Sequence, residues 1–93
     1  MSDWFVYIIR CSDGSLYTGI TTDLERRFEE HRSGKGAKYF RGRQALEIAY
    51  LETCADRSQA SCREAAIKSL PRAEKMRLVQ SSAWRRSPQT RQK

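Results

Sequence analysis

The sequence predicts an α+β domain, in which a small three-stranded antiparallel β-sheet is flanked by helices in the order β-β-α-β-α-α. Residues 4–11 and 16–21 are rich in aromatic and β-branched side chains and are separated by turn residues, as in a β-hairpin. Residues 45–53 alternate as a third strand. Three segments have helical patterns. One, from Thr22 to Gly34, lies between the hairpin and the third strand, and the other two, over about 58–70 and onward from Pro71, come after that strand.

The first hairpin can pair in two registers, and the turn decides between them. A two-residue turn at 13–14 would put Tyr7 and Tyr17 on opposite faces of the sheet. A three-residue loop at 12–14, with its glycine in the left-handed region, places Tyr7 opposite Gly19 and makes the tyrosines diagonal neighbours about 7–8 Å apart. Gly19 then leaves open space in front of Tyr7. Two ordinary strand tyrosines beside a glycine kink are the alternative interpretation.

The first helix has recognisable ends and an ion pair on its exposed side. Thr22 offers an N-cap, and Glu25 completes a capping box. Gly34 can end the helix as a left-handed cap. On the solvent side, Arg26 and Glu30 are spaced for an exposed ion pair.

The inward stripe of this helix carries two residues that are unusual there. Leu24, Arg27, Phe28 and His31 follow the spacing i, i+3, i+4, i+7 and share one face. A buried arginine and histidine indicate that something polar lies in front of them. Alternatively, Arg27 extends its charge to solvent and His31 complements the negative end of the helix.

The segment 32–43, RSGKGAKYFRGR, contains five basic residues and no acidic one. Its glycines let the backbone approach a phosphate chain closely, and Tyr39 and Phe40 can stack on bases. A solvated loop with one aromatic side chain in the core is the alternative. The net charge of +7 and the pI near 9.8 favour a nucleic-acid partner. The candidate contacts are Arg32, Lys35, Lys38, Tyr39, Arg41 and Arg43.

The third strand and the helix after it follow simpler patterns. The alternation predicts that Leu46, Ile48 and Tyr50 share one face of the strand. Residues 56–58 supply a turn and a cap for the next helix. The apolar stripe predicted for that helix consists of Ala60, Ala66, Ile67 and Leu70.

Two charged residues of that helix stand out. Glu64 lies beside the apolar stripe, and its pattern alone favours a surface carboxylate. Arg63 falls nearer the centre of the stripe, where periodicity does not explain a charge.

Length, apolar runs and cysteine content limit the classes of protein to which the sequence can belong. In this chain of 93 residues, we expect one domain over 1–80, followed by a basic, disordered tail over 81–93. No apolar run is long enough for a membrane span, and no signal-peptide pattern begins the chain. The three cysteines form no C-x-x-C pair and predict reduced thiols in the cytoplasm.

Several of these residues together resemble a known nuclease domain. Tyr7, then Tyr17-x-Gly19, then Asp23-Leu24-x-x-Arg27-x-x-x-His31, are similar to the GIY-YIG nuclease domain over about residues 3–80. The run 34–39, GKGAKY, resembles the small stand-alone (UPF0213-like) members. The motifs here read Val6-Tyr7-Ile8 and Tyr17-Thr18-Gly19, which keep both tyrosines and the structural Gly19. Many family nucleases carry a late asparagine in the site, and this sequence has no asparagine.

The resemblance implies metal-assisted hydrolysis of a phosphodiester bond. It makes Glu64 the ligand of one Mg²⁺ or Mn²⁺ and Arg27 the clamp on the scissile phosphate. Tyr7 is the implied general base, and a tyrosine with an ordinary pKa near 10 needs help at pH 7. His31 can accept that proton or hold Tyr7 in place, and Tyr17 can orient the water or the phosphate.

The resulting hypothesis is a small cytosolic endonuclease that acts on DNA rather than RNA, with a role in DNA repair or recombination. The basic, aromatic segment favours single-stranded or branched DNA over sequence readout. Two alternatives stay open: a non-catalytic nucleic-acid-binding module, and a nuclease subunit that needs a protein partner.

Overall fold

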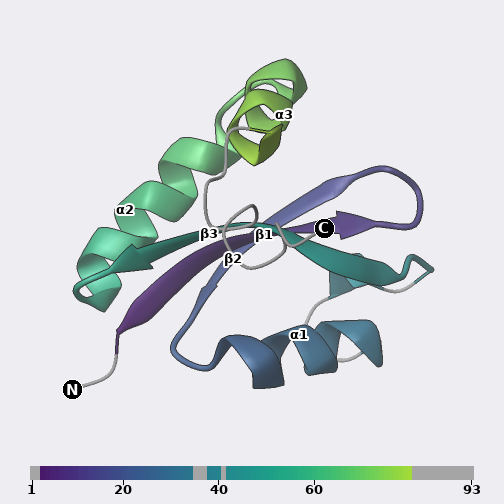
Figure 1. Cartoon of the computed structure of the whole chain (residues 1–93), viewed down its shortest axis with the longest axis horizontal. Coiled ribbons are helices and arrows are strands. Elements are labelled where there is room, and N and C mark those ends of the chain that lie inside the picture. The colour runs from purple at the N-terminus through teal and green to yellow at the C-terminus, as the bar shows by residue number, and fades with distance from the viewer. Residues whose placement is uncertain (1–2, 35–37, 41, 81–93) are drawn as a thin grey trace, which may run out of the picture.

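The computed structural model describes residues 3–34, 38–40 and 42–80, and it contains one sheet and three α-helices in that part of the chain (Figure 1). The strands lie in the order β2-β1-β3 and pair antiparallel, which confirms the predicted α+β class. The elements are β1 (Trp4–Cys11), β2 (Leu16–Thr21), α1 (Leu24–Arg32), the 3₁₀ turn η1 (Lys38–Phe40), β3 (Ala45–Cys54), α2 (Arg57–Lys68) and α3 (Arg72–Gln80). The predicted tail at 81–93 lies outside the described residues.

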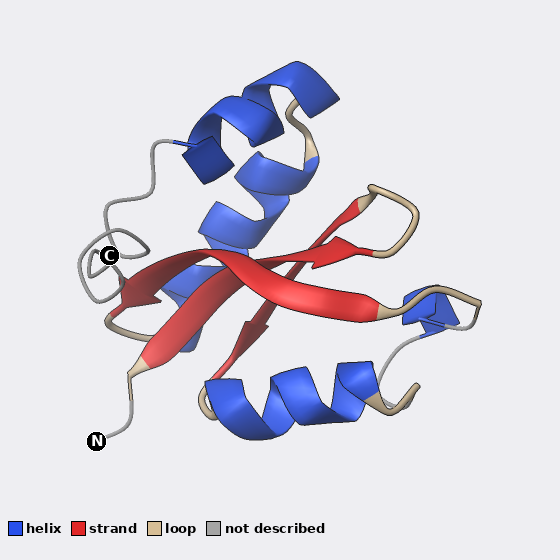
Figure 2. Cartoon of the chain, turned by 45° about the vertical axis from the view of Figure 1, so that its right-hand side comes forward, coloured by secondary structure: helices blue, strands red, loops and turns tan. Residues whose placement is uncertain are grey.

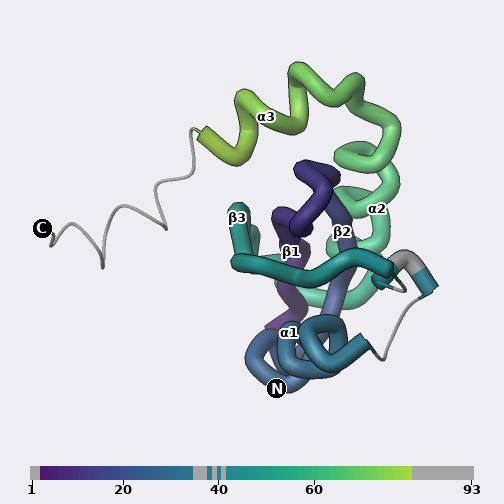
Figure 3. The backbone as a smooth tube through the Cα atoms, turned by 90° about the vertical axis from the view of Figure 1, so that its right-hand side faces the viewer, coloured from purple at the N-terminus to yellow at the C-terminus, as the bar shows by residue number. Residues whose placement is uncertain are grey.

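The sheet separates two layers of helix. Helix α1 packs below the sheet, and α2 with α3 lies above it (Figures 1 and 2). Seen from the side in Figure 3, α1 and α3 lie on opposite sides of the strands. Across the described ranges, none of the helices is long and apolar enough to cross a membrane.

Each face of the sheet has its own hydrophobic core. Strand β1 is the central strand, so Val6 and Ile8 face α2 and α3 while Tyr7 and Ile9 face α1 and η1. All four are at most 1% exposed. A central strand covered on both faces buries consecutive residues, and this accounts for the apolar run in β1.

The hairpin adopts the register that brings the two tyrosines to one face. Tyr7 pairs with Gly19, and Ile9 pairs with Tyr17. Gly14 has φ +84°, and its amide donates to the Cys11 carbonyl at 2.9 Å. The three-residue loop is therefore confirmed, because the left-handed glycine lets Cys11 close the ladder with Ser15.

Helix α1 begins one residue later than the predicted cap. Asp23, not Thr22, is the N-cap, and its Oδ1 accepts a hydrogen bond from the Arg26 amide at 3.2 Å. The side chain of Thr21 accepts from the Asp23 amide at 3.1 Å and so fixes the turn into the helix. The predicted end is confirmed: Gly34 has φ +87° and donates to the His31 carbonyl.

Strand β3 does not keep the predicted alternation. Ile8 pairs with Tyr50 but Ile9 pairs with Ile48, which leaves Ala49 as an extra residue. Ala49 and Tyr50 then pack on the α2 side, whereas Ile48 packs on the α1 side. The prediction that Leu46, Ile48 and Tyr50 share one face is wrong. The bulge at Ala49 depends on how β3 pairs with β1, and the local sequence of β3 does not reveal that pairing.

A second shift in β3 exposes a leucine. Arg10 pairs with Glu47 and Cys11 with Ala45, so Leu46 is also an extra residue. Its exposure of 46% makes it an exposed large hydrophobic side chain rather than part of the core.

Helix α2 begins at the predicted place. Asp56 is the N-cap and accepts from the Gln59 amide at 2.8 Å. Ala60 and Ile67 are buried as expected, but Ala66 is exposed, so that part of the stripe is wrong.

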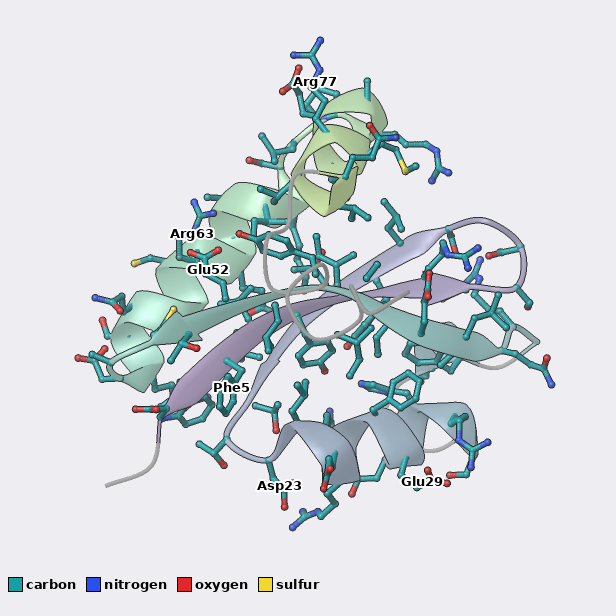
Figure 4. All side chains as sticks on the ribbon, in the orientation of Figure 1. Phe5, Asp23, Glu29, Glu52, Arg63 and Arg77 are labelled. Atoms are coloured by element: carbon teal, nitrogen blue, oxygen red, sulfur yellow. The ribbon has the colours of Figure 1, made fainter. Side chains whose placement is uncertain are left out.

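An ion pair accounts for the unexplained charge on α2. The Arg63 guanidinium donates to both carboxylate oxygens of Glu52 on β3, at 2.7 and 3.0 Å (Figure 4). The Tyr50 hydroxyl donates to the same carboxylate at 3.0 Å. Arg63 therefore anchors α2 to the sheet through a bidentate contact.

Candidate active site

Tyr7 lies at the centre of the candidate site, packed directly over Gly19. A Cβ added to Gly19 would lie 2.7 Å from Cζ of Tyr7 and 3.2 Å from a ring carbon of Tyr17, and it would also clash with the Tyr7 hydroxyl. Real Cβ atoms do not approach other atoms so closely. Gly19 is therefore required because the phenol of Tyr7 fills the space that was predicted to be open.

His31 reaches the same hydroxyl from the other side. Its Nε2 lies 2.9 Å from the Tyr7 hydroxyl oxygen, and its side chain is 1% exposed in the last turn of α1. Phe40 from η1 stacks on the imidazole with ring centroids 4.4 Å apart. Tyr17 packs edge-on against both rings, at 5.1 Å from His31 and 4.9 Å from Phe40. These contacts fix the orientation of the Tyr7–His31 pair.

Arg27, one turn before His31, is held between two partners. Its side chain hydrogen-bonds to Tyr7, and its Nη1 donates to Glu30 Oε1 at 2.8 Å. The hydrogen bond that the guanidinium donates to Glu30 raises its pKa most, burial lowers it, and the bond donated to Tyr7 raises it further. The Arg27 side chain as a whole remains a third exposed.

The environment of Tyr7 keeps its hydroxyl protonated. The pKa of Tyr7 is raised from 10 to about 12, mainly by burial, and the electrostatic interaction with the neighbouring Tyr17 acts in the same direction. The hydrogen bond from Arg27 and its positive charge lower the pKa by a smaller amount. Tyr7 at pH 7 is thus a phenol whose proton needs an acceptor.

Glu64 on α2 comes close enough to act on Tyr7 electrostatically. Its negative charge is one of the causes that raise the Tyr7 pKa. The side chain is 24% exposed, and its Oε2 lies 3.1 Å from Lys68 Nζ. The charge of a residue on α2 therefore acts on Tyr7 from the helix layer opposite α1 (Figure 1).

The carboxylates of the site can be tested against a divalent ion. In residues 3–34, 38–40 and 42–80, no three His, Cys, Asp or Glu side chains gather into a metal site. Glu64 supplies a partly exposed carboxylate whose charge acts on Tyr7. This donor set fits Mg²⁺ or Mn²⁺ bound through one carboxylate, waters and substrate phosphate oxygens, and it does not fit a closed protein cage.

The basic segment is described only in part. Arg32 pairs with Glu29 at 2.7 Å, Arg43 pairs with Asp13 at 2.8 Å, and Lys38 is exposed. The remaining predicted contacts, Lys35, Arg41 and the side chain of Tyr39, lie outside the described part.

Phe40 corrects one expectation for this segment. It is 3% exposed and packs against His31 and Tyr17, so it belongs to the core and is unavailable for base stacking. The register of a 3₁₀ turn decides which of two adjacent aromatic side chains points inward, and sequence periodicity does not reveal that register.

Two residues of the site were missed from the sequence. The sequence leaves Phe40 either stacking on a base or lying in the core, and it predicts Glu30 only as a surface partner of Arg26. Glu30 does approach Arg26 at 3.4 Å, but its shorter contact is with Arg27. The i, i+3 spacing from Arg27 was a signal that could have found it.

Comparisons with known proteins place the chain among relatives of one family. The GIY-YIG catalytic domain matches residues 3–77. The UPF0213 protein DP2720 from Desulfotalea psychrophila is 56% identical over 80 residues, covering 85% of this chain and 73% of that protein. The UPF0213 protein YhbQ from Escherichia coli O139:H28 is 51% identical over 83 residues, covering 89% of this chain and 83% of that protein. The solution NMR structure of the UPF0213 protein BH0048 from Bacillus halodurans matches with a TM-score of 0.55 at 44% identity, covering 84% of this chain and 83% of that one.

Proposed function

The chain belongs to the GIY-YIG catalytic domain family, and on that premise we propose that it is a divalent-metal-dependent endonuclease that hydrolyses phosphodiester bonds in DNA. Family membership points to a nuclease, and nucleases of this family generally depend on a divalent metal. The observation that carries the proposal is that Arg27 and His31 both hydrogen-bond to the Tyr7 hydroxyl above Gly19. The charge of Glu64 also acts on Tyr7. Each of these groups has a use in phosphoryl transfer.

Arg27 is proposed to clamp the scissile phosphate. Glu30 and Tyr7 take up part of its planar fork, and its partial exposure leaves room for a phosphate oxygen. A guanidinium fixed before the substrate arrives needs no reorganisation as negative charge develops in the transition state. Glu30 thus acts as a positioning residue for Arg27.

Tyr7 and His31 are proposed to move the proton of the attacking water together. The Tyr7 oxygen takes the water proton as its own proton passes to His31 Nε2, 2.9 Å away. The hydroxide forms a bond to phosphorus while the bond to the 3′ oxygen breaks. This route avoids a free phenolate, which a pKa of about 12 disfavours at neutral pH.

Glu64 is proposed to hold the divalent ion, which when bound stabilises charge on the phosphate and on the leaving 3′ oxygen. Lys68, 3.1 Å from the carboxylate, neutralises Glu64 in its absence. The side chain of Lys68 is exposed and flexible enough to turn away.

The substrate is proposed to be single-stranded or branched DNA, as arises in repair and recombination. The basic segment 32–43 suits backbone contacts rather than readout of base sequence. We place the activity in the cytoplasm, because the three cysteines are free thiols and Cys62 is exposed.

A nicking assay tests the proposal. The protein is incubated with end-labelled single-stranded, duplex and branched DNA and with RNA, in Mg²⁺ or in chelator. The expected result is cleavage of single-stranded or branched DNA that the chelator abolishes. Tight binding without cleavage in any metal would instead identify a non-catalytic binding module, and cleavage that appears only on addition of a cell extract would identify a subunit that needs a partner.

A further inference from the structure

A cavity of about 220 Å³ opens beside the candidate site, at the junction of β1, β2 and α1. Its volume is below the roughly 300 Å³ at the lower end of drug-sized pockets, so it suits one base rather than several nucleotides. The residues that matter for its chemistry are Trp4, Ile20, Asp23, Arg26, Arg27 and Glu30.

The cavity adjoins the candidate site on three elements and shares Arg27 with it. On α1, the residues 23, 26, 27 and 30 form one helical stripe, and Arg27 belongs both to this stripe and to the inward one that ends at His31. On β2, Ile20 directly follows Gly19, over which the Tyr7 phenol lies. On β1, Trp4 precedes Tyr7 by three residues, or about 10 Å of strand. A ligand in the cavity would therefore lie next to a phosphate held by Arg27.

The lining selects a neutral, aromatic ligand over an anion. Asp23 caps α1, and Glu30 pairs with Arg26 and Arg27, so the carboxylates offset the two cations. Inside the cavity, a phosphate group would gain little net attraction from these balanced charges. A nucleobase is uncharged, and its amino groups can donate to carboxylate oxygens while its ring packs on an apolar wall.

Trp4 supplies that wall. It is partly buried against the core shared with Ile20, and the guanidinium of Arg57 lies 5.9 Å from its ring centroid. Stacking on an aromatic side chain accepts any base, because every base has a π face. A base still paired in a duplex cannot enter a cavity of this size, since its partner and neighbours come with it.

We propose that the cavity formed by Trp4, Ile20, Arg26 and Arg27 is a subsite for one unpaired base that flanks the scissile phosphate. The inference rests on the proposed nuclease function and adds a structural cause for its choice of substrate. The strand that is cut must offer an unstacked base next to the cut.

Trp4 fluorescence tests this directly. The second tryptophan, Trp84, is replaced by phenylalanine so that Trp4 is the only reporter. In chelator, the protein is titrated with single-stranded oligonucleotide and with duplex, and labelled-DNA anisotropy measures saturation. The expected result is quenching by the single strand and none by the duplex. Saturated single-strand binding without quenching would overturn the inference.

A pair of variants separates base stacking from loss of packing. Trp4→Leu should weaken single-strand binding about 5- to 100-fold while leaving its salt dependence unchanged. Tyr50→Leu also removes a partly buried aromatic ring that packs on the same core, but it lies away from the cavity and should bind as wild type. Equal affinity of Trp4→Leu and wild type would overturn the subsite.

The outcomes distinguish this inference from the proposed function. Metal-dependent cleavage without quenching of Trp4 would contradict the subsite and leave the nuclease intact. Quenching and selective binding without cleavage in any metal would support the subsite and contradict the nuclease. Absence of binding to every oligonucleotide would contradict both.

Discussion

The surroundings of Tyr7 leave its phenol almost no freedom to move. Gly19 lies against its hydroxyl end, His31 hydrogen-bonds to its oxygen, and Arg27 does so from the same helix. Such packing raises the cost of removing the proton but fixes where the proton can go. In the proposed chemistry this arrangement favours proton transfer. A water next to Tyr7 meets a hydroxyl oxygen that is already hydrogen-bonded to His31.

Tyr7→Phe should remove a pH dependence of stability at alkaline pH. The unfolded tyrosine loses its proton near pH 10, whereas the folded one keeps it until about pH 12. The unfolded state therefore binds fewer protons in this window, and the free energy of unfolding falls as pH rises. Between pH 9 and 11.5 wild type should lose about 2 kcal/mol more than Tyr7→Phe, as measured by urea unfolding. Parallel losses in the two proteins would mean that Tyr7 is not held as a buried phenol.

Gly19→Ala should disable the site through steric contact with Tyr7. The added methyl group meets Cζ of Tyr7 at 2.7 Å, and moving that buried ring costs about 1–3 kcal/mol. Gly14→Ala is the matched control, because Gly14 has φ +84° but nothing within 4 Å of the added Cβ. Both variants should lose stability in urea, and only Gly19→Ala should lose cleavage. Wild-type cleavage by Gly19→Ala would show that the position of Tyr7 is not needed.

At the scale of elements, the turns determine which residues meet. The left-handed Gly14 sets the register that pairs Tyr7 with Gly19, and Asp23 fixes the start of the helix that presents Arg27. The 3₁₀ turn η1 inserts Phe40 against His31 and thereby holds one end of the basic segment at the site. Lys38, the first residue of η1, is exposed beside it.

Lys38→Ala should reduce the salt dependence of DNA binding without a matching loss of turnover. Each phosphate contact contributes a slope of about 0.7 on single strands and 0.9 on duplexes in log affinity against log salt. The measurement is a salt titration of binding in chelator, with cleavage at saturating DNA in Mg²⁺ as the second readout. Arg77→Ala on α3 is the control, since Arg77 is 77% exposed but lies on the far helix layer. An unchanged slope for Lys38→Ala would mean that η1 does not contact the DNA backbone.

The sequence could predict the features that depend on interactions between residues close together in the chain. The hairpin, the inward Arg27 and His31, and the glycine that ends α1 depend on neighbours within a few residues. The bulge at Ala49 depends on the partner strand, and the insertion of Phe40 depends on where η1 meets the sheet. Local patterns contain neither kind of information.

Glu64 illustrates the same limit within the site. Its pattern on α2 indicates a surface carboxylate, and its approach to Tyr7 depends on how α2 crosses the opposite face of the sheet. Only the resemblance to a family singled it out in the sequence. Its electrostatic effect on Tyr7 now gives a physical reason to consider it.

At the scale of the whole molecule, the candidate site depends on both layers of the domain. In the proposed site, α1 supplies Arg27 and His31, and α2 supplies Glu64 from the opposite helix layer (Figure 1). Gly19 lies on β2, an edge strand, which leaves one side of the site uncovered by the sheet. The central claim is that these two layers together form one metal-dependent nuclease site.

The most direct test is single-turnover cleavage of a labelled single strand by wild type and Glu64→Gln in Mg²⁺. Glu74→Gln is the matched control, because Glu74 is also an ion-paired helical glutamate but lies on α3. The account predicts that Glu64→Gln folds and binds DNA in chelator as wild type does but no longer cleaves, since a neutral amide binds Mg²⁺ poorly. Glu74→Gln should cleave normally. Cleavage by Glu64→Gln at the wild-type rate would contradict the account.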